Sequence, residues 1–361
     1  MAGQVNPHPN PPPLRGRGSH GASDSLSRAA GEDGAHAERG RVGVQPLHSS
    51  LPTHLLFPLL SLLLAALIGF TLCWHAPGGP AIGLYGQDLA PGQAEETLRR
   101  LGLDRPFPEA FAAWLARALT GDLGISWRSG APVATILAER LPVTLALTIP
   151  AALLAALAGV LGGVIASAVR ARWPAAAFAA LHAIPSYVTA GALVAIFALT
   201  LGWLPVGGLS DPRAAAPHAL DIARHLVLPV AALATHQSAF LALVLRAGIA
   251  AEMARPYSLA ARARGRSDWG ARWHHAMPNA ALPAITLFAT RIGAALGGAV
   301  TVETAFALPG LGRLAVTAAL ARDHPVVLGC LLLATAAVIL ANLLADAVVA
   351  TLDPRLRRGG A

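Results

Sequence analysis

The sequence predicts an all-α integral membrane protein with six transmembrane helices and cytoplasmic N- and C-termini. Three observations lead to this prediction. Of the 361 residues, 55% are hydrophobic and only 13% are charged, whereas soluble domains average about 25% charged residues. Apolar runs of about 20 residues, the length that a helix needs to cross a bilayer, recur along the chain. Arginines gather in alternate connections between these runs, which sets the orientation.

The predicted spans follow one another after a polar N-terminal segment. They cover residues 51–74, 142–169, 174–204, 226–250, 281–302 and 325–352. Pro185 lies inside the third span and predicts a kink, because proline cannot donate a helical hydrogen bond. Residues 1–50 are rich in Pro, Gly, Ser and charge, so we expect them to be disordered or to lie upstream of the true start.

The other segments complete the organisation of the chain. Residues 75–141 form an extracytoplasmic helical segment, residues 142–352 a five-helix core with a connection at 251–280, and residues 353–361 a C-terminal tail. Two helices are expected in the segment 75–141. One begins near Pro91 and ends near Gly102. The other has an apolar face made by Phe107, Phe111, Trp114, Leu115 and Leu119, which we expect to cover the spans; the alternatives are that it lies on the membrane or receives a partner.

The arginine distribution places the 251–280 connection in the cytoplasm. The connection after the second span holds Arg170 and Arg172, and the 251–280 connection holds five arginines. The C-terminal tail holds three more: Arg355, Arg357 and Arg358. On the opposite side, Asp or Glu residues offset the arginines. Both termini and the 251–280 connection are therefore predicted to be cytoplasmic.

Composition excludes several classes of function. All 27 basic residues are arginine, so the chain cannot contain a phosphate-binding P-loop, which requires lysine. If ATP drives this protein, another subunit hydrolyses it. The net charge of +8 reflects topology and predicts no nucleic-acid partner. Cys73 and Cys330 lie in apolar runs without metal-ligand spacing, and no cofactor is expected.

The connection itself reads "YSLAARARGRSDWGARWHHAMPNAALP", residues 257–283. Residues 257–264 predict a short helix that ends at Gly265 in the left-handed conformation. Ser267 is the expected N-cap of a second helix, with Asp268 in its first turn. The small side chains Ala260, Ala261 and Ala263 would let another surface approach closely. A plain topology-setting loop is the alternative reading.

The spacing resembles the cytoplasmic coupling loop of ABC importer permeases, in which E-A-A, three residues, Gly, nine residues and I-x-L-P follow in order. This chain reads Leu259-Ala260-Ala261, Gly265 and His275-Ala276-Met277-Pro278, and lacks the leading acidic residue. "YSLAARARG" and "HHAMPNAALP" are similar to the peptide and nickel (oligopeptide/dipeptide) branch, with Arg264 where lysine is usual. The resemblance implies an ATPase-coupling loop made by Tyr257, Ala260, Ala261, Arg262, Ala263, Arg264, Gly265, His275 and Asn279.

Further motifs of that branch extend the resemblance over about residues 75–358. Upstream, "GDLGISW" (121–127) and "AIPSYV" (183–188) are similar to its landmarks, although "PGGPA" (77–81) lacks a usual Asp. The end of the chain matches at "DPRLR" (353–357). After the fifth span, the motif residues expected near the extracytoplasmic end include Glu303, Pro309, Gly310, Gly312, Arg322 and Asp323.

The resemblance implies a type I ABC importer-like permease fold and a subunit that is not itself an enzyme. The implied partners are a second permease subunit in a heterodimer, two cytoplasmic ATP-binding subunits, an extracytoplasmic solute-binding protein and membrane lipid. Alternating access would then carry peptides, nickel or a related small solute across the inner membrane. We expect Ala261 and Gly265 to dock closely on an ATPase, and Arg262 and Arg264 to orient it. The alternative is a stand-alone channel or ion-coupled secondary transporter.

Polar residues inside the apolar runs need a reason to be there, since a charge at mid-span costs about 2.5–3.5 kcal/mol on insertion scales. Arg246 is expected to snorkel to the membrane surface. Asp346 is a candidate partner for Arg291. His182 and His236 either satisfy interhelical hydrogen bonds or line a nickel path. Glu303 is expected either to hold the "LPGLG" turn or to touch substrate.

Overall fold

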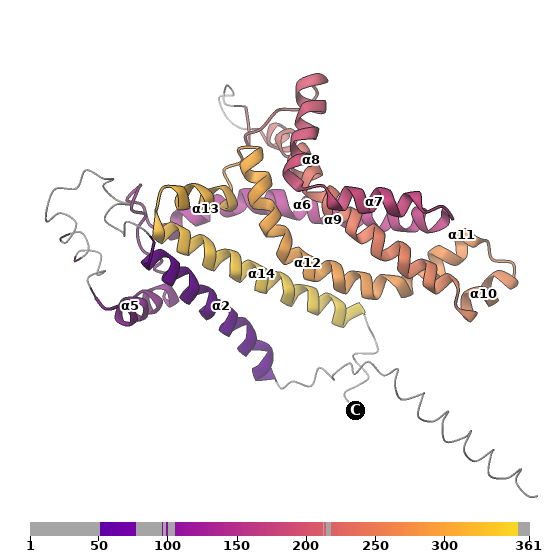
Figure 1. The fold of residues 1–361 in the computed structure, drawn as a ribbon, viewed down its shortest axis with the longest axis horizontal. Coiled ribbons are helices and arrows are strands. Elements are labelled where there is room, and N and C mark those ends of the chain that lie inside the picture. The colour runs from indigo at the N-terminus through magenta and orange to yellow at the C-terminus, as the bar shows by residue number, and fades with distance from the viewer. Residues whose placement is uncertain are drawn as a thin grey trace, which may run out of the picture. The chain divides into compact units, whose positions relative to one another are not determined.

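A computed structural model describes residues 51–76, 96, 99, 105–211, 213 and 218–352 (Figure 1). The predictions for the N-terminal tail, the C-terminal tail and most of the helix near Pro91 lie outside these residues. No strand occurs among the described residues, so the all-α prediction is confirmed for them. The helices are α2 (Leu51–Trp74), α5 (Phe107–Leu119), α6 (Val133–Ala168), α7 (Trp173–Ala183), α8 (Ser186–Leu193), the π-helix η1 (Val194–Thr200), α9 (Ala219–Met253), α10 (Pro256–Ala263), α11 (Asp268–Ala271), the π-helix η2 (Arg272–Ala276), α12 (Met277–Ala305), α13 (Leu311–Leu320) and α14 (His324–Leu352).

Four of the described helices are long and apolar enough to cross a membrane: α2, α6, α9 and α14. The pair α7 and α8–η1 counts as a fifth span if it is taken as one broken helix. The helix expected as the remaining span is α12, which packs along both α9 and α14. Each predicted span therefore corresponds to a helix or a broken helix, and α2 has the predicted bounds.

Two of the long helices begin earlier than the predicted spans. Helix α6 begins at Val133, nine residues before the predicted start, and Pro142 lies inside it. Val133 and Leu137 are buried against Val326 and Cys330 of α14, and this burial offsets the hydrogen bond that proline removes. Helix α9 likewise begins at Ala219 instead of residue 226, with Pro229 inside it.

The third predicted span breaks where only a kink was expected. Helix α7 ends at Ala183, α8 begins at Ser186, and the two are bent by 96°. Ile184 and Pro185 between them have extended backbone, which proline favours both for itself and for the residue before it.

The core of the molecule is the packing of α6 against α9. Two glycines of α6 allow the helices to approach closely. A Cβ atom on Gly159 would lie 2.7 Å from Leu241 Cβ, and one on Gly163 would lie 2.7 Å from Leu245 Cβ. Ala299 and Val302 of α12, and Phe306 directly after it, join this core.

Helix α5 covers α2 with an aromatic cluster. Phe70 lies at the centre, with its ring centroid 5.4 Å from those of both Phe111 and Trp114. Phe107 and Trp74 pack beside it. The apolar face predicted for this helix therefore packs on a predicted span, except that Leu119 is 80% exposed.

Candidate functional site

The connection between α9 and α12 folds into a helical hairpin, Pro256–Ala276, which we call the α10–α11 hairpin. Helix α10 ends at Ala263, and Gly265 follows with φ +88°, a left-handed conformation that disfavours residues with a Cβ. The Ser267 hydroxyl caps α11 by accepting a hydrogen bond from Gly270 N at 3.1 Å. Both turn elements predicted from the sequence are confirmed.

Side-chain hydrogen bonds tie the hairpin to the two long helices that flank it. The Tyr257 hydroxyl donates to the Glu252 carboxylate at the end of α9. It accepts from Asn279 Nδ2 of α12 at 3.1 Å, and the same amide donates to His275 O at 2.8 Å. The first and last residues of the proposed coupling loop, 22 positions apart, are therefore in direct contact.

The Tyr257 phenol stays a donor at neutral pH. Its pKa lies above the ordinary value of 10.0, first because burial penalises the phenolate and second because of the hydrogen bond to Glu252. The contact with the carboxylate is therefore a charge-assisted hydrogen bond, one of the stronger kinds.

The faces of α10 divide the predicted loop residues into two groups. Ala261 is only 5% exposed and Ser258 is fully buried, so this face packs on the chain itself. In the single chain Ala261 therefore packs on the protein itself, and its docking on an ATPase stays a prediction. The exposed residues of the hairpin include Tyr257, Leu259, Ala260, Ala263, Arg264, Gly265, Trp269 and Trp273.

The arginines also differ in their contacts. Arg262 Nη1 lies 3.4 Å from Asp268 Oδ1, so this guanidinium joins α10 to α11 within the hairpin. Arg264 is exposed at the C-terminal end of α10. His275 is half-buried in η2, beside Ala276, which packs into the core formed with α9.

Away from the hairpin, the residues predicted near the extracytoplasmic end include Glu303. Its carboxylate is the centre of a buried hydrogen-bond network between α6, α12 and α13, which we call the Glu303 network. Glu303 is fully buried, and its carboxylate accepts from Thr144 Oγ1 at 2.6 Å and from Arg313 N at 3.0 Å. Thr144 in turn accepts from Leu311 N at 2.9 Å. Glu303 therefore holds the turn that leads into α13, which is the first of its two expected roles.

The glycines of this turn make room for that carboxylate. A Cβ atom on Gly310 would lie 2.3 Å from the Glu303 carboxyl carbon, and one on Gly312 would lie 2.6 Å from Val300 Cα. Pro309 O accepts from Arg140 Nη1 of α6 at 3.4 Å. The glycines of "LPGLG" are thus required by the close approach of α12.

Asp323 anchors a second connection. Arg322 has φ +57°, so the backbone turns after α13 and directs Asp323 inward. The Asp323 carboxylate accepts from Ser126 Oγ and from Trp127 N, the latter at 3.1 Å. The "GDLGISW" motif and the "ARDHP" motif, almost 200 residues apart in sequence, therefore bind each other.

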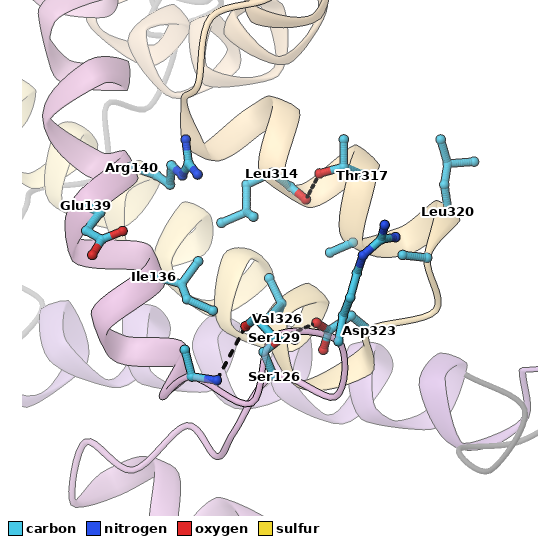
Figure 2. A pocket seen from close by; sticks show the side chains of 14 residues that line it. Ser126, Ser129, Ile136, Glu139, Arg140, Leu314, Thr317, Leu320, Asp323 and Val326 are labelled. Atoms are coloured by element: carbon cyan, nitrogen blue, oxygen red, sulfur yellow. Dashed lines mark hydrogen bonds between the residues drawn. The ribbon is translucent and has the colours of Figure 1, made fainter. Parts of the chain in front are cut away.

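A pocket of about 840 Å³ lies above this contact (Figure 2). Its wall is formed by the start of α6, by α13 and by the start of α14, and Ser126 and Asp323 lie among its lining residues. Charged side chains at its edge come from Arg128, Glu139 and Arg140. The pocket lies at the opposite end of α6 from the α10–α11 hairpin, because Arg246 near the end of α9 donates to Ala166 O at the end of α6.

Two arginines in the predicted spans make the following contacts. Arg246 donates to Ala166 O and Ala171 O, both at 3.3 Å, so its guanidinium reaches the C-terminal end of α6, and its snorkelling to the membrane surface stays a prediction. The Arg291 guanidinium carbon lies 4.1 Å from the centre of the Phe240 ring, while Asp346 is exposed. No ion pair joins Arg291 to Asp346 among the described side chains.

Sequence reasoning did not find the residues that complete these sites. Thr144 and Ser126 are single hydroxyls in apolar or landmark stretches, and only the fold brings them to Glu303 and Asp323. Glu252 and Arg140 carry no signal beyond being charged residues near a span. A buried carboxylate needs donors, but the sequence does not say which hydroxyl supplies them.

The arrangement defines a class: a multi-pass membrane protein whose exposed hairpin is tied to two of its long helices. Residues 155–358 match the family described as "Binding-protein-dependent transport system inner membrane component". Residues 53–148 match the companion description of the N-terminal part of such membrane components. The chain belongs to this family of transport permeases, which are not themselves enzymes, in the inner membrane.

The chain matches several curated relatives over nearly the whole of their length. A putative peptide permease protein of Brucella ovis is 35% identical over 312 residues, which span 84% of this chain and 97% of the relative. A putative peptide transport system permease protein of Brucella abortus is 36% identical over 300 residues, 82% and 95% of the two chains. A glutathione transport system permease protein of Escherichia coli is 32% identical over 301 residues, again 82% and 95%. The resemblance to the peptide and nickel branch of ABC importer permeases is confirmed.

Proposed function

We propose that this chain forms the translocation path for peptides or related small solutes and works by alternating access, driven by separate ATPase subunits. Family membership and the relatives' roles with peptides and glutathione support this proposal. The same relatives favour peptides over nickel. They also argue against a stand-alone channel, because the family is dependent on binding proteins.

In this proposal six spans cross the membrane: α2, α6, the broken pair α7–α8, α9, α12 and α14. Both termini and the α10–α11 hairpin face the cytoplasm, because arginines concentrate in the connections on that side. The pocket beside Ser126 then faces the extracytoplasmic solute-binding protein. A second, related permease subunit completes the path, and lipid surrounds the pair.

The hairpin is the proposed contact with one of two ATPases. The observation that supports this role best is that its exposed face is braced at both ends. Leu259, Ala260, Ala263 and Arg264 are free to meet a partner. Tyr257 meanwhile binds Glu252 of α9 and Asn279 of α12. A push on this face therefore reaches two spans through short, directed hydrogen bonds.

Uptake by the assembled complex in proteoliposomes tests the proposal. With the binding protein and labelled trialanine or glutathione outside the vesicles and ATP inside, we expect uptake that stops on addition of vanadate. The matched control omits ATP and imposes an ion gradient. Uptake driven by that gradient alone would overturn the proposal in favour of a secondary transporter.

A further inference from the structure

A cluster of polar side chains lies where α7, α9 and α12 meet, and neither the hairpin nor the pocket uses it. The His182 and His236 rings stack with centroids 4.2 Å apart. Phe240 lies between His182 and Arg291: the centre of its ring is 5.6 Å from the centre of the His182 ring and 4.1 Å from the Arg291 guanidinium carbon. We name these residues, together with Gln237, the midspan cluster.

Arg291 stands too deep in α12 to reach the ends of the helix. It is fourteen residues from both Met277 and Ala305, or about 21 Å along the axis at 1.5 Å per residue. Helices α9 and α14, which flank α12, are both apolar enough to span the bilayer. A charge at such a depth marks a functional position more often than a structural one.

The contact of Arg291 with the face of the Phe240 ring uses none of the hydrogen-bond donors of the guanidinium. A guanidinium that stacks on an aromatic ring uses its flat face, while its N–H groups point outward in its own plane. Among the described side chains, which exclude those of 289, 290 and 292–296, Phe240 provides the only contact with Arg291 that the structure records. That in-plane fork matches a carboxylate with two parallel hydrogen bonds.

Neighbouring atoms of the cluster also lack partners. His182 Nδ1 donates to His236 O at 3.2 Å, which fixes the His182 ring. His236 Nδ1 and Gln237 Oε1 are buried without a hydrogen-bond partner in the described part of the chain. Buried polar atoms are rarely left unpaired, and the described residues, which exclude the side chains of 289, 290 and 292–296, supply no partner for either atom.

The break between α7 and α8 lies directly after His182. Extended backbone at Ile184 and Pro185 interrupts the helices here, and Ser186 Oγ at the start of α8 lies 3.0 Å from Thr301 Oγ1 of α12. Irregular backbone at membrane depth is tolerated where it lines a cavity or is buried in protein. The side chains of the midspan cluster are partly exposed in the single chain, although the two unpaired atoms, His236 Nδ1 and Gln237 Oε1, are themselves buried.

We propose that the midspan cluster is a subsite for a carboxylate of the transported solute, with Arg291 as the residue that binds it and Phe240 and His182 holding the arrangement. This inference rests on the proposed function, since a peptide carries such a carboxylate through the path. The other source of the same group is an acidic side chain of the second permease subunit, and the experiment separates the two.

Arg291→Gln in the complete complex provides the test, with Arg291→Lys as the charge-keeping variant and Thr286→Val as the control on the same helix. Thr286 is exposed, and its hydroxyl donates to Leu282 O of its own helix. We expect ATP-driven uptake of labelled trialanine to fall at least tenfold in R291Q and less in R291K. Stimulation of ATPase activity by the loaded binding protein should stay within twofold of wild type, as should both readouts in T286V.

Other outcomes overturn the inference in distinct ways. Uptake by R291Q within twofold of wild type would show that Arg291 does not bind a carboxylate of the solute. Loss of the second permease subunit from purified R291Q complex would assign the carboxylate to that subunit. If the R291Q chain were absent from the membrane, Arg291 would have a role in folding. Poor insertion could not explain such a loss, because removal of a charge makes insertion easier. Failure of the proposed function is separate, because wild-type complex would then show no ATP-driven uptake.

Discussion

Gly310 occupies a position where a single methyl group is expected to disturb the fold. Its Cβ would meet the buried Glu303 carboxylate at 2.3 Å, and that carboxylate cannot move without losing Thr144 and Arg313 N. We expect Gly310→Ala to destabilise the detergent-solubilised protein by about 1–3 kcal/mol, the usual cost of overpacking. Gly297→Ala is the matched control, because nothing lies within 4 Å of its added Cβ. Equal melting temperatures for the two variants would contradict the claim that the Glu303 carboxylate leaves no room for a side chain at residue 310.

Gly265 is constrained by its backbone and not by its surroundings. Its φ of +88° is unfavourable for a β-branched residue, although open space surrounds it. We expect Gly265→Val to re-angle the hairpin and abolish transport while membrane levels stay normal. Gly265→Asn should keep more activity, since Asn tolerates left-handed conformations better. Normal uptake by the valine variant would count against the coupling role.

At the residue scale, local signals were predictable and long-range partners were not. Gly265 and Ser267 are set by turn and cap chemistry within a few residues, and both were found from the sequence. The exposure of Ala261 depends on which face of α10 packs on the chain, which eight residues with three alanines do not reveal. Glu303 was expected to have one of two roles, and only its contact with Thr144, 159 positions away, distinguishes them.

At the scale of elements, the hairpin is held as one unit because the Tyr257 hydroxyl at its start bonds both to Glu252 of α9 and to Asn279 of α12. Tyr257→Phe removes the hydroxyl that joins Glu252 to Asn279, and Asn279→Ala removes the amide. We expect each substitution to lower ATPase-coupled uptake. The double variant should be little worse than the more severe single variant, because both break the same link. Independent, additive losses in this double-mutant cycle would show that the two side chains act separately.

The length of the apolar runs predicted where the long helices lie, but not the residues at which they begin or break. The predicted starts at 142 and 226 are both too late, because Pro142 is accommodated inside α6 and the charged residues Asp221 and Arg224 lie inside α9. At Pro185 the opposite error occurred, and a predicted kink is a 96° break. Proline signals one missing hydrogen bond, whereas tertiary packing decides whether the helix continues through it.

At the scale of the whole molecule, α6 and α12 each connect two kinds of site. One end of α12 binds the hairpin through Asn279, its middle carries Arg291, and its other end carries Glu303. Helix α6 parallels this arrangement, from the pocket residue Arg140 to the end capped by Arg246. Motion at the hairpin therefore has a continuous, packed route to the opposite end, which alternating access requires.

The proposed orientation places the two ends of that route on opposite sides of the membrane, and labelling of single cysteines tests it. Cys73 and Cys330 would first be replaced by alanine, after which Arg264→Cys and Arg128→Cys each place one thiol at an exposed position at opposite ends of α6. In intact cells we expect a membrane-impermeant maleimide to label the residue-128 thiol and not the residue-264 thiol. Inside-out vesicles should show the reverse. Labelling of both thiols from one side would contradict an odd number of crossings between them, and with it the assignment of the hairpin to the cytoplasm.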